Sequence, residues 1–333
     1  MKPNDIEIII SQIFQLQNAA EFNALAVKIF HLQYQNVAVY RAYCDAVHSN
    51  PKSIKTVEEI PFLPIQFFKS KRIYWDQIET KNATTFMSSG TTATGRSKHH
   101  VFDLKVYEQS FTACFEQFYG PVEDMTILAL LPSYLDQGNS SLVYMVKSLI
   151  EKSNDSRSGF YLNNDEILPI LKSVESEGKN TLLIGVTYAL LDMIEQSIFN
   201  LNHTIIMETG GMKGRRKEMT KTELHNILCK GFGVKEIHSE YGMTELLSQG
   251  YSTGGEWFRF PNWMKCFLRP INDPLTMLSK TDKTGGINVI DLANIYSCSF
   301  IATQDLGRLN DGQLKIMGRF DHSDTRGCNL MVE

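Results

Sequence analysis

Apolar residues at the start of the chain recur with the spacing of amphipathic helices. Positions such as Ile9, Ile13 and Leu16 are separated mostly by three or four residues, which is the period of one helix face. We predict helices from Ile6 to about Ser49. The next stretch, EEIPFLPIQFFKS at 58–70, carries two nearby prolines. Because proline does not fit inside a regular helix, we predict an extended crossing segment there.

From residue 84 onward, short apolar runs alternate with longer amphipathic stretches. Short apolar runs are typical of buried parallel strands, and their alternation with helices predicts an α/β fold. Strands are predicted at 84–89, 125–132, 180–186, 203–210 and 234–239, and helices at 104–119, 141–152, 187–198 and 216–232. After about Gly250 the helical patterns stop. Short strands and turns follow, including 283–292, 296–309 and 312–320, which predicts a β-rich C-terminal third.

Composition narrows the class of partner. The 333 residues are 43% hydrophobic with a formal net charge of -4, enough for a large core. No Lys/Arg-rich run is present, which disfavours nucleic acid and acidic membrane surfaces and favours a small-molecule ligand. No apolar run is long enough to cross a bilayer and the N-terminus lacks a signal-peptide layout, so a cytoplasmic protein is expected.

A segment dense in glycine, hydroxyl and basic residues follows the first predicted strand. In SSGTTATGRSK at 88–98, glycines let backbone N–H groups approach phosphate oxygens, hydroxyls donate hydrogen bonds and basic side chains neutralise charge. A polar surface turn is the plainer alternative. The candidate phosphate-binding residues are Ser88, Ser89, Gly90, Thr91, Thr92 and Lys98.

The same segment nearly matches the P-loop pattern G-x-x-x-x-G-K-[ST], with Arg96 where lysine is expected. A P-loop opens a helix whose N-terminus faces the phosphates. Here the loop continues into KHHVFD, which has the pattern of a strand. We therefore predict a phosphate-gripping hairpin rather than a P-loop.

Two later segments add nucleotide-binding chemistry. The run IIMETGG ends a predicted strand with Gly210 and Gly211, and EYGMTE places Tyr241, Thr244 and Glu245 in a loop after the strand predicted at 234–239. An aromatic face can stack on a purine, a hydroxyl can bind an α-phosphate and a carboxylate can hold Mg²⁺. Each of these residues alone would be unremarkable in a loop.

Taken in order, these segments resemble the adenylate-forming superfamily of acyl-CoA synthetases, adenylation domains and firefly-type luciferases. The matching segments are SSGTT with GRSK, ETGG, EYGMTE, TQDLGRL and GRFD. Three more segments are similar to the acyl-protein synthetases, or long-chain-fatty-acid protein ligases, of the bacterial bioluminescence fatty-acid reductases. They are IPFLPIQFFK, LLPSYLDQGNSSLVYM and DTRGCNL, and the resemblance runs from about Val57 to the C-terminus.

The resemblance implies an α/β, acyl-CoA synthetase-like N-terminal domain with a β-rich C-terminal third and without a full C-terminal lid or its catalytic lysine. It divides the chain into a helical N-terminal arm at 1–55, an adenylate-forming catalytic domain at 56–320, and a hinge with a short tail at 321–333. Gln304 stands where the superfamily usually has glycine. We expect a less permissive turn at that position.

The resemblance also implies a site for ATP and Mg²⁺, including the glycines Gly210, Gly211 and Gly242 and the loop from Ser88 to Thr92. In that site Tyr241 would stack on adenine, Thr244 would contact the α-phosphate, Glu245 would ligate Mg²⁺, Asp305 would bind ribose and Arg319 would steady the nucleotide. The catalytic candidates are Thr244, Glu245, Lys98 and Cys328.

Cys328 is the candidate acyl acceptor. It follows Arg326 and Gly327 near the C-terminus, and an adjacent guanidinium favours the thiolate. A small buried residue in a last strand is the alternative, and the resemblance, in which a cysteine near the C-terminus carries the acyl group, favours the functional role. The six cysteines form no C-x-x-C pair or Cys/His cluster, so free thiols are expected. Core packing is expected for Cys44, Cys114 and Cys229, which lie in helical patterns.

The predicted reaction converts a carboxylic acid, expected to be a fatty acid, and ATP into an acyl-adenylate and pyrophosphate. The acyl group then passes to Cys328 and on to a partner such as an acyl reductase. One alternative is transfer directly to coenzyme A or a carrier protein, with Cys328 structural. Another is a non-catalytic, nucleotide-binding regulatory subunit. Apolar residues of PSYLDQGNSSLVYM either line an acyl tunnel or belong to the ordinary core.

Overall fold

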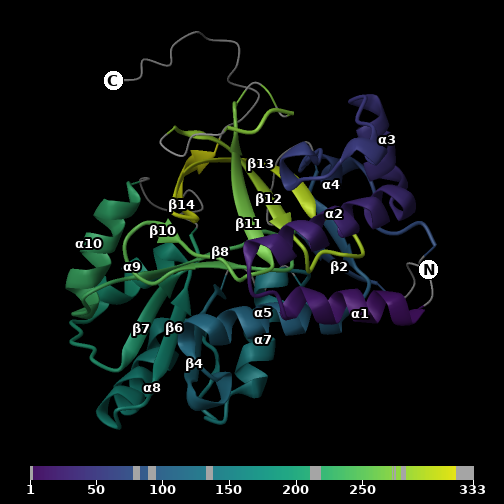
Figure 1. Ribbon diagram of the computed structural model, residues 1–333. Coiled ribbons are helices and arrows are strands. Elements are labelled where there is room, and N and C mark those ends of the chain that lie inside the picture. Colours follow the sequence, from purple (N-terminus) through teal and green to yellow (C-terminus); the bar gives the residue numbers. More distant parts are fainter. Residues whose placement is uncertain are drawn as a thin grey trace.

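A computed structural model describes residues 3–77, 83–88, 95–132, 138–210, 219–271, 273, 275–278 and 283–319. Two six-stranded sheets and one two-stranded sheet organise the described part of the chain. Helices surround one of the larger sheets, and the N-terminal helices pack beside the other (Figure 1). One continuous hydrophobic core joins these parts. The predicted α/β class with a β-rich C-terminal third is confirmed.

The N-terminal helices pack on the C-terminal strands rather than standing apart. Gln33 is buried, and its Nε2 donates to the carbonyl oxygens of Asn294 and Ile295, both at 3.0 Å. Phe14 meets Trp263 edge to face, with ring centroids 5.0 Å apart. The helices predicted between residues 6 and 49 are confirmed as α1 (Pro3–Phe14), α2 (Ala19–Asn36) and α3 (Ala38–Ala46).

The segment at 58–70 is extended only in part. Residues Leu63–Pro64 form β1, which pairs in parallel with Ile301 and Ala302. The prediction is wrong at both ends of the segment, because the 3-10 turn Val57–Glu59 occupies its start and Phe67–Ser70 form the short helix α4. Another 3-10 turn, Pro51–Ser53, lies before the segment. Proline restricts itself and the residue before it, so the residues after Pro64 are free to turn and bury Phe68.

The hairpin predicted around the candidate phosphate-binding segment is present. Strands β2 (Thr84–Met87) and β3 (Lys98–Val101) pair antiparallel, from Thr84 opposite Val101 to Met87 opposite Lys98. The next helix, α5 (Leu104–Tyr119), begins only after β3 and is capped by Asp103. The strand on the far side of the loop confirms a hairpin in place of a P-loop.

The parallel sheet has the strand order β5-β4-β6-β7-β8-β9, in which only β9 is antiparallel to its neighbour. Every residue of β4 and β6 is buried, which explains why these strands are continuous apolar runs. Its strands are β4 (Thr126–Leu130), β5 (Gly159–Phe160), β6 (Thr181–Gly185), β7 (Thr204–Glu208), β8 (His238–Tyr241) and β9 (Gly250–Ser252). Its helices are α7 (Ser141–Lys152), α8 (Asn164–Ser176), α9 (Thr187–Gln196) and α10 (Lys221–Phe232).

Two predicted boundaries in this sheet need correction. The helix expected from residue 216 begins at Lys221, because Thr220 and Glu223 form a capping box that starts it. The strand expected at 234–239 lies at His238–Tyr241, where Tyr241 pairs with Gly250 of β9. Tyr241 is therefore the last residue of a strand and not part of the following loop.

The second sheet has the order β10-β14-β13-β12-β11, with β1 added beside β13. Its strands are β10 (Trp257–Phe258), β11 (Met264–Arg269), β12 (Gly285–Asp291), β13 (Phe300–Asn310) and β14 (Gln313–Arg319). The β12–β13 register shifts, so that Gly286 pairs with Leu306 while Asn288 pairs with Ala302. Residues 303–305 thus bulge opposite Ile287, which re-aims their side chains.

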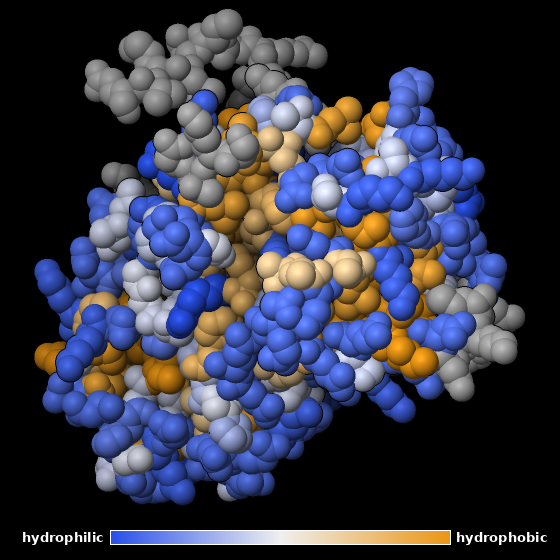
Figure 2. Space-filling view, in the orientation of Figure 1, coloured by the Kyte–Doolittle hydropathy of each residue, from blue (hydrophilic) through white to orange (hydrophobic). Residues whose placement is uncertain are grey.

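Hydrophilic residues cover most of the face seen in Figure 2, whereas apolar colours gather toward its middle. Among the described helices, none combines the length and apolar character needed to span a bilayer.

Candidate functional site

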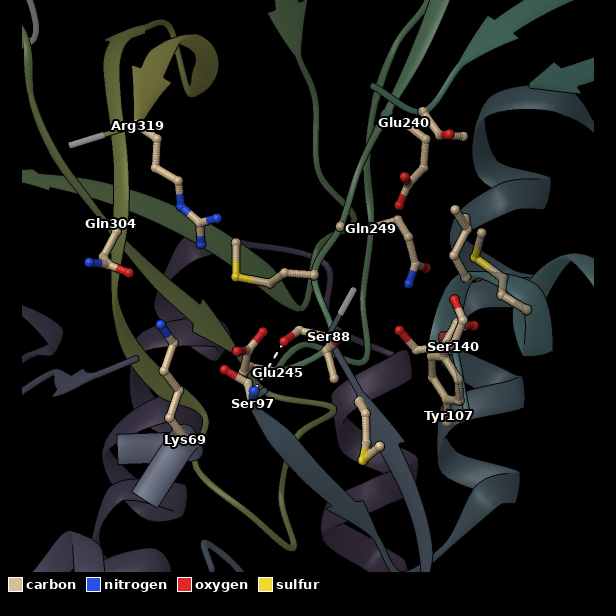
Figure 3. A pocket seen from close by; sticks show the side chains of 18 of the residues that line it. Lys69, Ser88, Ser97, Tyr107, Ser140, Glu240, Glu245, Gln249, Gln304 and Arg319 are labelled. Carbon is tan, nitrogen blue, oxygen red and sulfur yellow. Dashed lines mark hydrogen bonds between the residues drawn. The ribbon is translucent and has the colours of Figure 1, made fainter. Parts of the chain in front are cut away.

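A cavity of about 380 Å³ lies where the two sheets and the β2–β3 hairpin meet. Figure 3 shows Lys69, Gln304 and Arg319 on one side of it, Glu240, Gln249, Ser140 and Tyr107 on the other, and Ser88, Ser97 and Glu245 between them. Five of the residues predicted from the sequence line it, namely Ser88, Gly242, Thr244, Glu245 and Arg319. Three segments predicted separately, at residues 88, 242–245 and 319, therefore meet at one cavity.

A buried histidine contacts the backbone of the loop that carries Thr244 and Glu245. His99 Nδ1 lies 2.8 Å from the carbonyl oxygen of Thr244, and its Nε2 lies 3.0 Å from Asn294 Oδ1. The amide of Asn294 donates to the carbonyl oxygen of Glu245 at 2.8 Å. Burial lowers the pKa of His99 to about 4. The two adjacent carbonyls are thus fixed, and Thr244 and Glu245 both line the cavity.

A buried carboxylate anchors the next turn of the same loop. Asp291 Oδ2 accepts from the backbone N–H groups of Leu247 at 2.7 Å and Ser248 at 2.9 Å, and Oδ1 accepts from the Ser248 hydroxyl at 2.6 Å. Because Asp291 belongs to β12, these bonds attach the loop after β8 to the second sheet. Both sheets therefore determine where Glu245 lies.

Glu245 itself is a buried carboxyl at the cavity wall. Burial raises its pKa, while a hydrogen bond from Ser97 and the positive charge of Arg319 act in the opposite direction. Within the described part of the chain, His, Cys, Asp and Glu side chains form no group of three or more that could hold a metal. Mg²⁺ is often held by one or two carboxylates together with substrate phosphates and water. A single carboxylate beside a polar cavity fits that ion.

The bulge in β13 places Asp305 and corrects the turn expected at Gln304. The Thr303 hydroxyl donates to the Ile287 carbonyl at 2.9 Å and accepts from the Asp305 N–H at 3.1 Å. Arg269 donates to the carbonyls of Ile287 at 2.8 Å and Thr303 at 2.6 Å. Side chains thus supply hydrogen bonds to backbone groups where the pairing of β12 and β13 is interrupted, and the segment is a strand bulge rather than a turn. Gln304 has no positive φ, so glycine is not needed there.

Asp305 is oriented by two neighbours. Its Oδ2 accepts a 2.8 Å hydrogen bond from the Tyr241 hydroxyl, and its Oδ1 lies 3.6 Å from Arg319 Nε on the directly paired strand β14. Burial raises the pKa of Asp305, whereas Tyr241 and Arg319 favour the ionised form. Tyr241 is buried against Phe258 and Phe260 and does not line the cavity. Its predicted stacking on adenine stays a prediction.

The hairpin contributes hydroxyls from the residues that directly follow β2 and directly precede β3. The Ser88 hydroxyl accepts from the Ser97 N–H at 3.0 Å, and the Ser88 N–H donates to the Ser97 carbonyl at 3.1 Å. Ser97 is buried and lines the cavity, whereas Lys98 is exposed and does not. The structure thus does not bring Lys98 to the cavity. Ser89, Gly90, Thr91 and Thr92 lie outside the described residues.

The glycine segment after β7 turns beside a buried carboxylate. Gly210 has φ +75° and donates its N–H to Glu208 Oε2 at 2.7 Å. Glu208 also lies 3.1 Å from Lys221 Nζ and 3.6 Å from His225 Nε2. Although burial opposes it, these partners lower the pKa of Glu208 to about 2. Gly210 does not line the cavity, and Gly211 lies outside the described residues.

A second carboxyl, Glu240, lies at the opposite end of the cavity from Lys69 (Figure 3). Burial and the nearby charge of Glu208 raise its pKa to about 8. Gly242 lies close to it, because a Cβ at that position would overlap Glu240 Oε1. Gln249 is buried beside this end, and its Oε1 has no hydrogen-bond partner among the residues that the structure describes. This end of the cavity is therefore polar.

Sequence reasoning missed Lys69, Glu240, Gln249 and Tyr107 as cavity residues. Glu240 is the first residue of the EYGMTE segment, so a sequence signal for it was present, whereas nothing local marked the other three. Of the segment proposed as an acyl tunnel, Ser140, Ser141, Leu142 and Met145 line the cavity.

All described cysteines are free thiols, as expected. Burial raises the pKa of Cys44, to about 12, and also the pKa of Cys114, Cys229, Cys266 and Cys298. None of the five lines the cavity. Cys328 lies outside the described residues.

Comparison with known proteins gives consistent results. A family model described as acyl-protein synthetase, LuxE, matches residues 9–333. A curated relative, the long-chain-fatty-acid--luciferin-component ligase of Aliivibrio fischeri, is 23% identical over 339 residues, covering 92% of this chain and 86% of that protein.

Solved structures share the fold. ATP-bound MatB from Rhodopseudomonas palustris superposes with a TM-score of 0.53 at 16% identity over 83% of this chain, which spans only 52% of MatB. A 2-hydroxyisobutyryl-CoA ligase in complex with 2-HIB-AMP and CoA gives 0.61 at 11% identity, covering 92% of this chain and 71% of that one. The fold is that of the adenylate-forming, acyl-CoA synthetase-like domains.

Proposed function

Since the chain belongs to the LuxE acyl-protein synthetase family, we propose that it activates a carboxylic acid with ATP and passes the acyl group to a thiol. The observation that carries this proposal is the convergence of Thr244, Glu245, Ser97 and Arg319 on one cavity, with Asp305 beside it. Hydroxyls, a guanidinium and buried carboxyls from distant segments are the groups that ATP requires around its phosphates and ribose.

In the first step, an oxygen of the substrate carboxylate forms a bond to the α-phosphorus of ATP. The bond from that phosphorus to the bridging oxygen breaks, and pyrophosphate leaves with the electron pair. Thr244 donates a hydrogen bond to a phosphate oxygen, Ser97 keeps its hydrogen bond to Glu245, Arg319 supplies positive charge, and Asp305 binds the ribose hydroxyls. Mg²⁺ bound at Glu245 would neutralise charge on the phosphates. The step needs no general base, because the attacking carboxylate is already ionised.

In the second step, a thiolate attacks the acyl carbon and AMP leaves with the electron pair of the broken C–O bond. We propose Cys328 as this thiol, because Arg326 lies two residues before it in the sequence and burial raises the pKa of all five described cysteines. The curated relative is named for long-chain fatty acids. A fatty acid is therefore the proposed substrate, and an acyl reductase or carrier is the proposed final acceptor.

The experiment is exchange of labelled pyrophosphate into ATP over a panel of fatty, aryl and short-chain acids. We expect exchange that depends on both Mg²⁺ and the acid, and no exchange without acid. A protein that binds ATP but catalyses no exchange with any acid would instead be a nucleotide-binding regulatory subunit. Formation of acyl-CoA without any labelling of the protein would assign the second step to coenzyme A.

A further inference from the structure

Lys69 brings a positive charge into the cavity from a segment that carries none of the nucleotide motifs. It belongs to the short helix α4, and it lines the cavity together with Ser97, Glu245 and Gln304. Figure 3 shows its amine directed toward the space between Gln304 and Glu245. The only other Lys or Arg among the described lining residues is Arg319.

The two cations differ in how they are held. Arg319 lies 3.6 Å from Asp305, and its side chain is 68% exposed. Lys69 is half-buried, and within the described residues it forms no ion pair with a carboxylate. A half-buried ammonium without an anionic partner favours an anion from solution, because the attraction between charges is stronger where water is partly excluded.

The backbone around Lys69 is tied to the same elements that carry the proposed ATP-binding residues. The Ile65 N–H donates to the Ala302 carbonyl at 3.0 Å, which joins the start of α4 to the strand of Gln304 and Asp305. Phe68 meets His99 edge to face, with ring centroids 5.6 Å apart. His99 in turn contacts the Thr244 carbonyl. The position of Lys69 is therefore fixed relative to Thr244 and Glu245.

We propose that Lys69 is a catalytic residue of adenylation, whose ammonium group contacts the oxygens of the α-phosphate as the carboxylate attacks. This inference rests on the proposed function. Bond formation to the α-phosphorus and departure of pyrophosphate place negative charge on the phosphate oxygens, on the side of the cavity that holds Ser97 and Glu245. Lys69 keeps its proton throughout and supplies charge and hydrogen bonds. Because Glu240 lies at the opposite end of the cavity, it does not neutralise the positive charge of Lys69.

The test compares Lys69→Met with Lys69→Arg and with the control Lys71→Met. Methionine keeps the length and apolar stem of lysine but removes the charge. Lys71 is exposed, lies two residues further along and does not line the cavity. For each protein, the turnover of acid-dependent pyrophosphate exchange, the dissociation constant for ATP and the thermal unfolding midpoint are measured.

Removal of one preorganised donor to transition-state charge lowers turnover about 100- to 1,000-fold. We expect that loss in Lys69→Met, with an ATP dissociation constant changed less than about 5-fold and an unchanged unfolding midpoint. Lys69→Arg should recover at least about 10-fold of the lost turnover, because it restores the charge. Lys71→Met should behave as wild type.

Normal turnover in Lys69→Met would overturn the inference while leaving the proposed function intact. Weaker ATP binding with unchanged turnover would also overturn it, since Lys69 would then stabilise bound ATP and the transition state equally. Loss of turnover together with a lowered unfolding midpoint and no recovery by arginine would make the role structural. If wild type exchanges no pyrophosphate with any acid, the proposed function fails, and the catalytic role of Lys69 fails with it.

Discussion

The hydrogen bond between Tyr241 and Asp305 predicts non-additive effects on ATP binding. Asp305→Ala removes the proposed charge-assisted bonds to ribose, which contribute roughly 1.5–3 kcal/mol. Since about 1.4 kcal/mol corresponds to a tenfold change in affinity, we expect ATP to bind about 10- to 150-fold more weakly. The loss should be smaller for a deoxyribose analogue of ATP, because fewer ribose bonds remain to be lost.

Tyr241→Phe tests the same site by removing the hydrogen bond that orients Asp305. The substitution keeps the ring packed on Phe258 and Phe260 and removes only the hydroxyl that lies 2.8 Å from Asp305 Oδ2. Loss of that bond should cost about 1 kcal/mol in ATP affinity, or about 5-fold, because Asp305 is less well oriented. In the double mutant, Tyr241→Phe should add nothing to the loss caused by Asp305→Ala, so the coupling energy should equal about 1 kcal/mol.

The assay is calorimetric titration of the four proteins with ATP and with the deoxyribose analogue. Denaturant unfolding of each protein checks the fold, because Asp305→Ala also leaves the buried Tyr241 hydroxyl without its partner at a cost of about 1–3 kcal/mol in stability. Equal losses for ATP and the analogue would show that Asp305 does not bind ribose. Additive losses in the double mutant would show that Tyr241 acts on the nucleotide independently of Asp305.

Three further predictions concern the carboxyls and the thiol. Glu245→Gln should abolish Mg²⁺-dependent pyrophosphate exchange with an unchanged unfolding midpoint, and wild-type exchange rates in this variant would rule out the metal assignment. The pKa of Glu240 is raised from 4.5 to about 8, so its protonated form stabilises the fold below about pH 4.5, and this contribution is lost as pH rises through 8. Thermal unfolding at pH 5 and pH 8.5 should therefore show a larger fall for wild type than for Glu240→Gln, and equal falls would contradict the shift. Cys328→Ser should eliminate a hydroxylamine-sensitive acyl label formed from ATP and labelled fatty acid while leaving pyrophosphate exchange largely unchanged; a label that persists would place the acceptor on another cysteine.

Local chemistry determined much of what could be predicted. The alternation of apolar runs and amphipathic stretches predicted the parallel strands, because strands buried on both faces need continuous apolar residues. The strand on each side of the glycine-rich loop was visible in the sequence and separated a hairpin from a P-loop. Residues such as Thr244 and Glu245 were identifiable because their side-chain types and spacing suit a phosphate and a metal.

Other features depended on partners that are distant in the sequence. The extended conformation of Gln304 follows from a bulge opposite Ile287. The side chains of Thr303 and Arg269 donate hydrogen bonds to the Ile287 carbonyl at this bulge. Tyr241 belongs to a strand because Gly250 pairs with it. Local propensity contains no information on either pairing, because the hydrogen bonds that stabilise them come from other strands.

The cavity shows most clearly which features were predictable from the sequence and which depended on tertiary packing. The sequence by itself determined that hydroxyls, carboxyls and glycines suited to a nucleotide were present, but it did not reveal Lys69 or the polar end formed by Glu240 and Gln249. Lys69 reaches the cavity only because β1 pairs with β13 and Phe68 packs on His99. The charge state of Glu240 likewise depends on burial and on Glu208 from the neighbouring strand. Both effects depend on distance and solvent exclusion, and only tertiary packing establishes these.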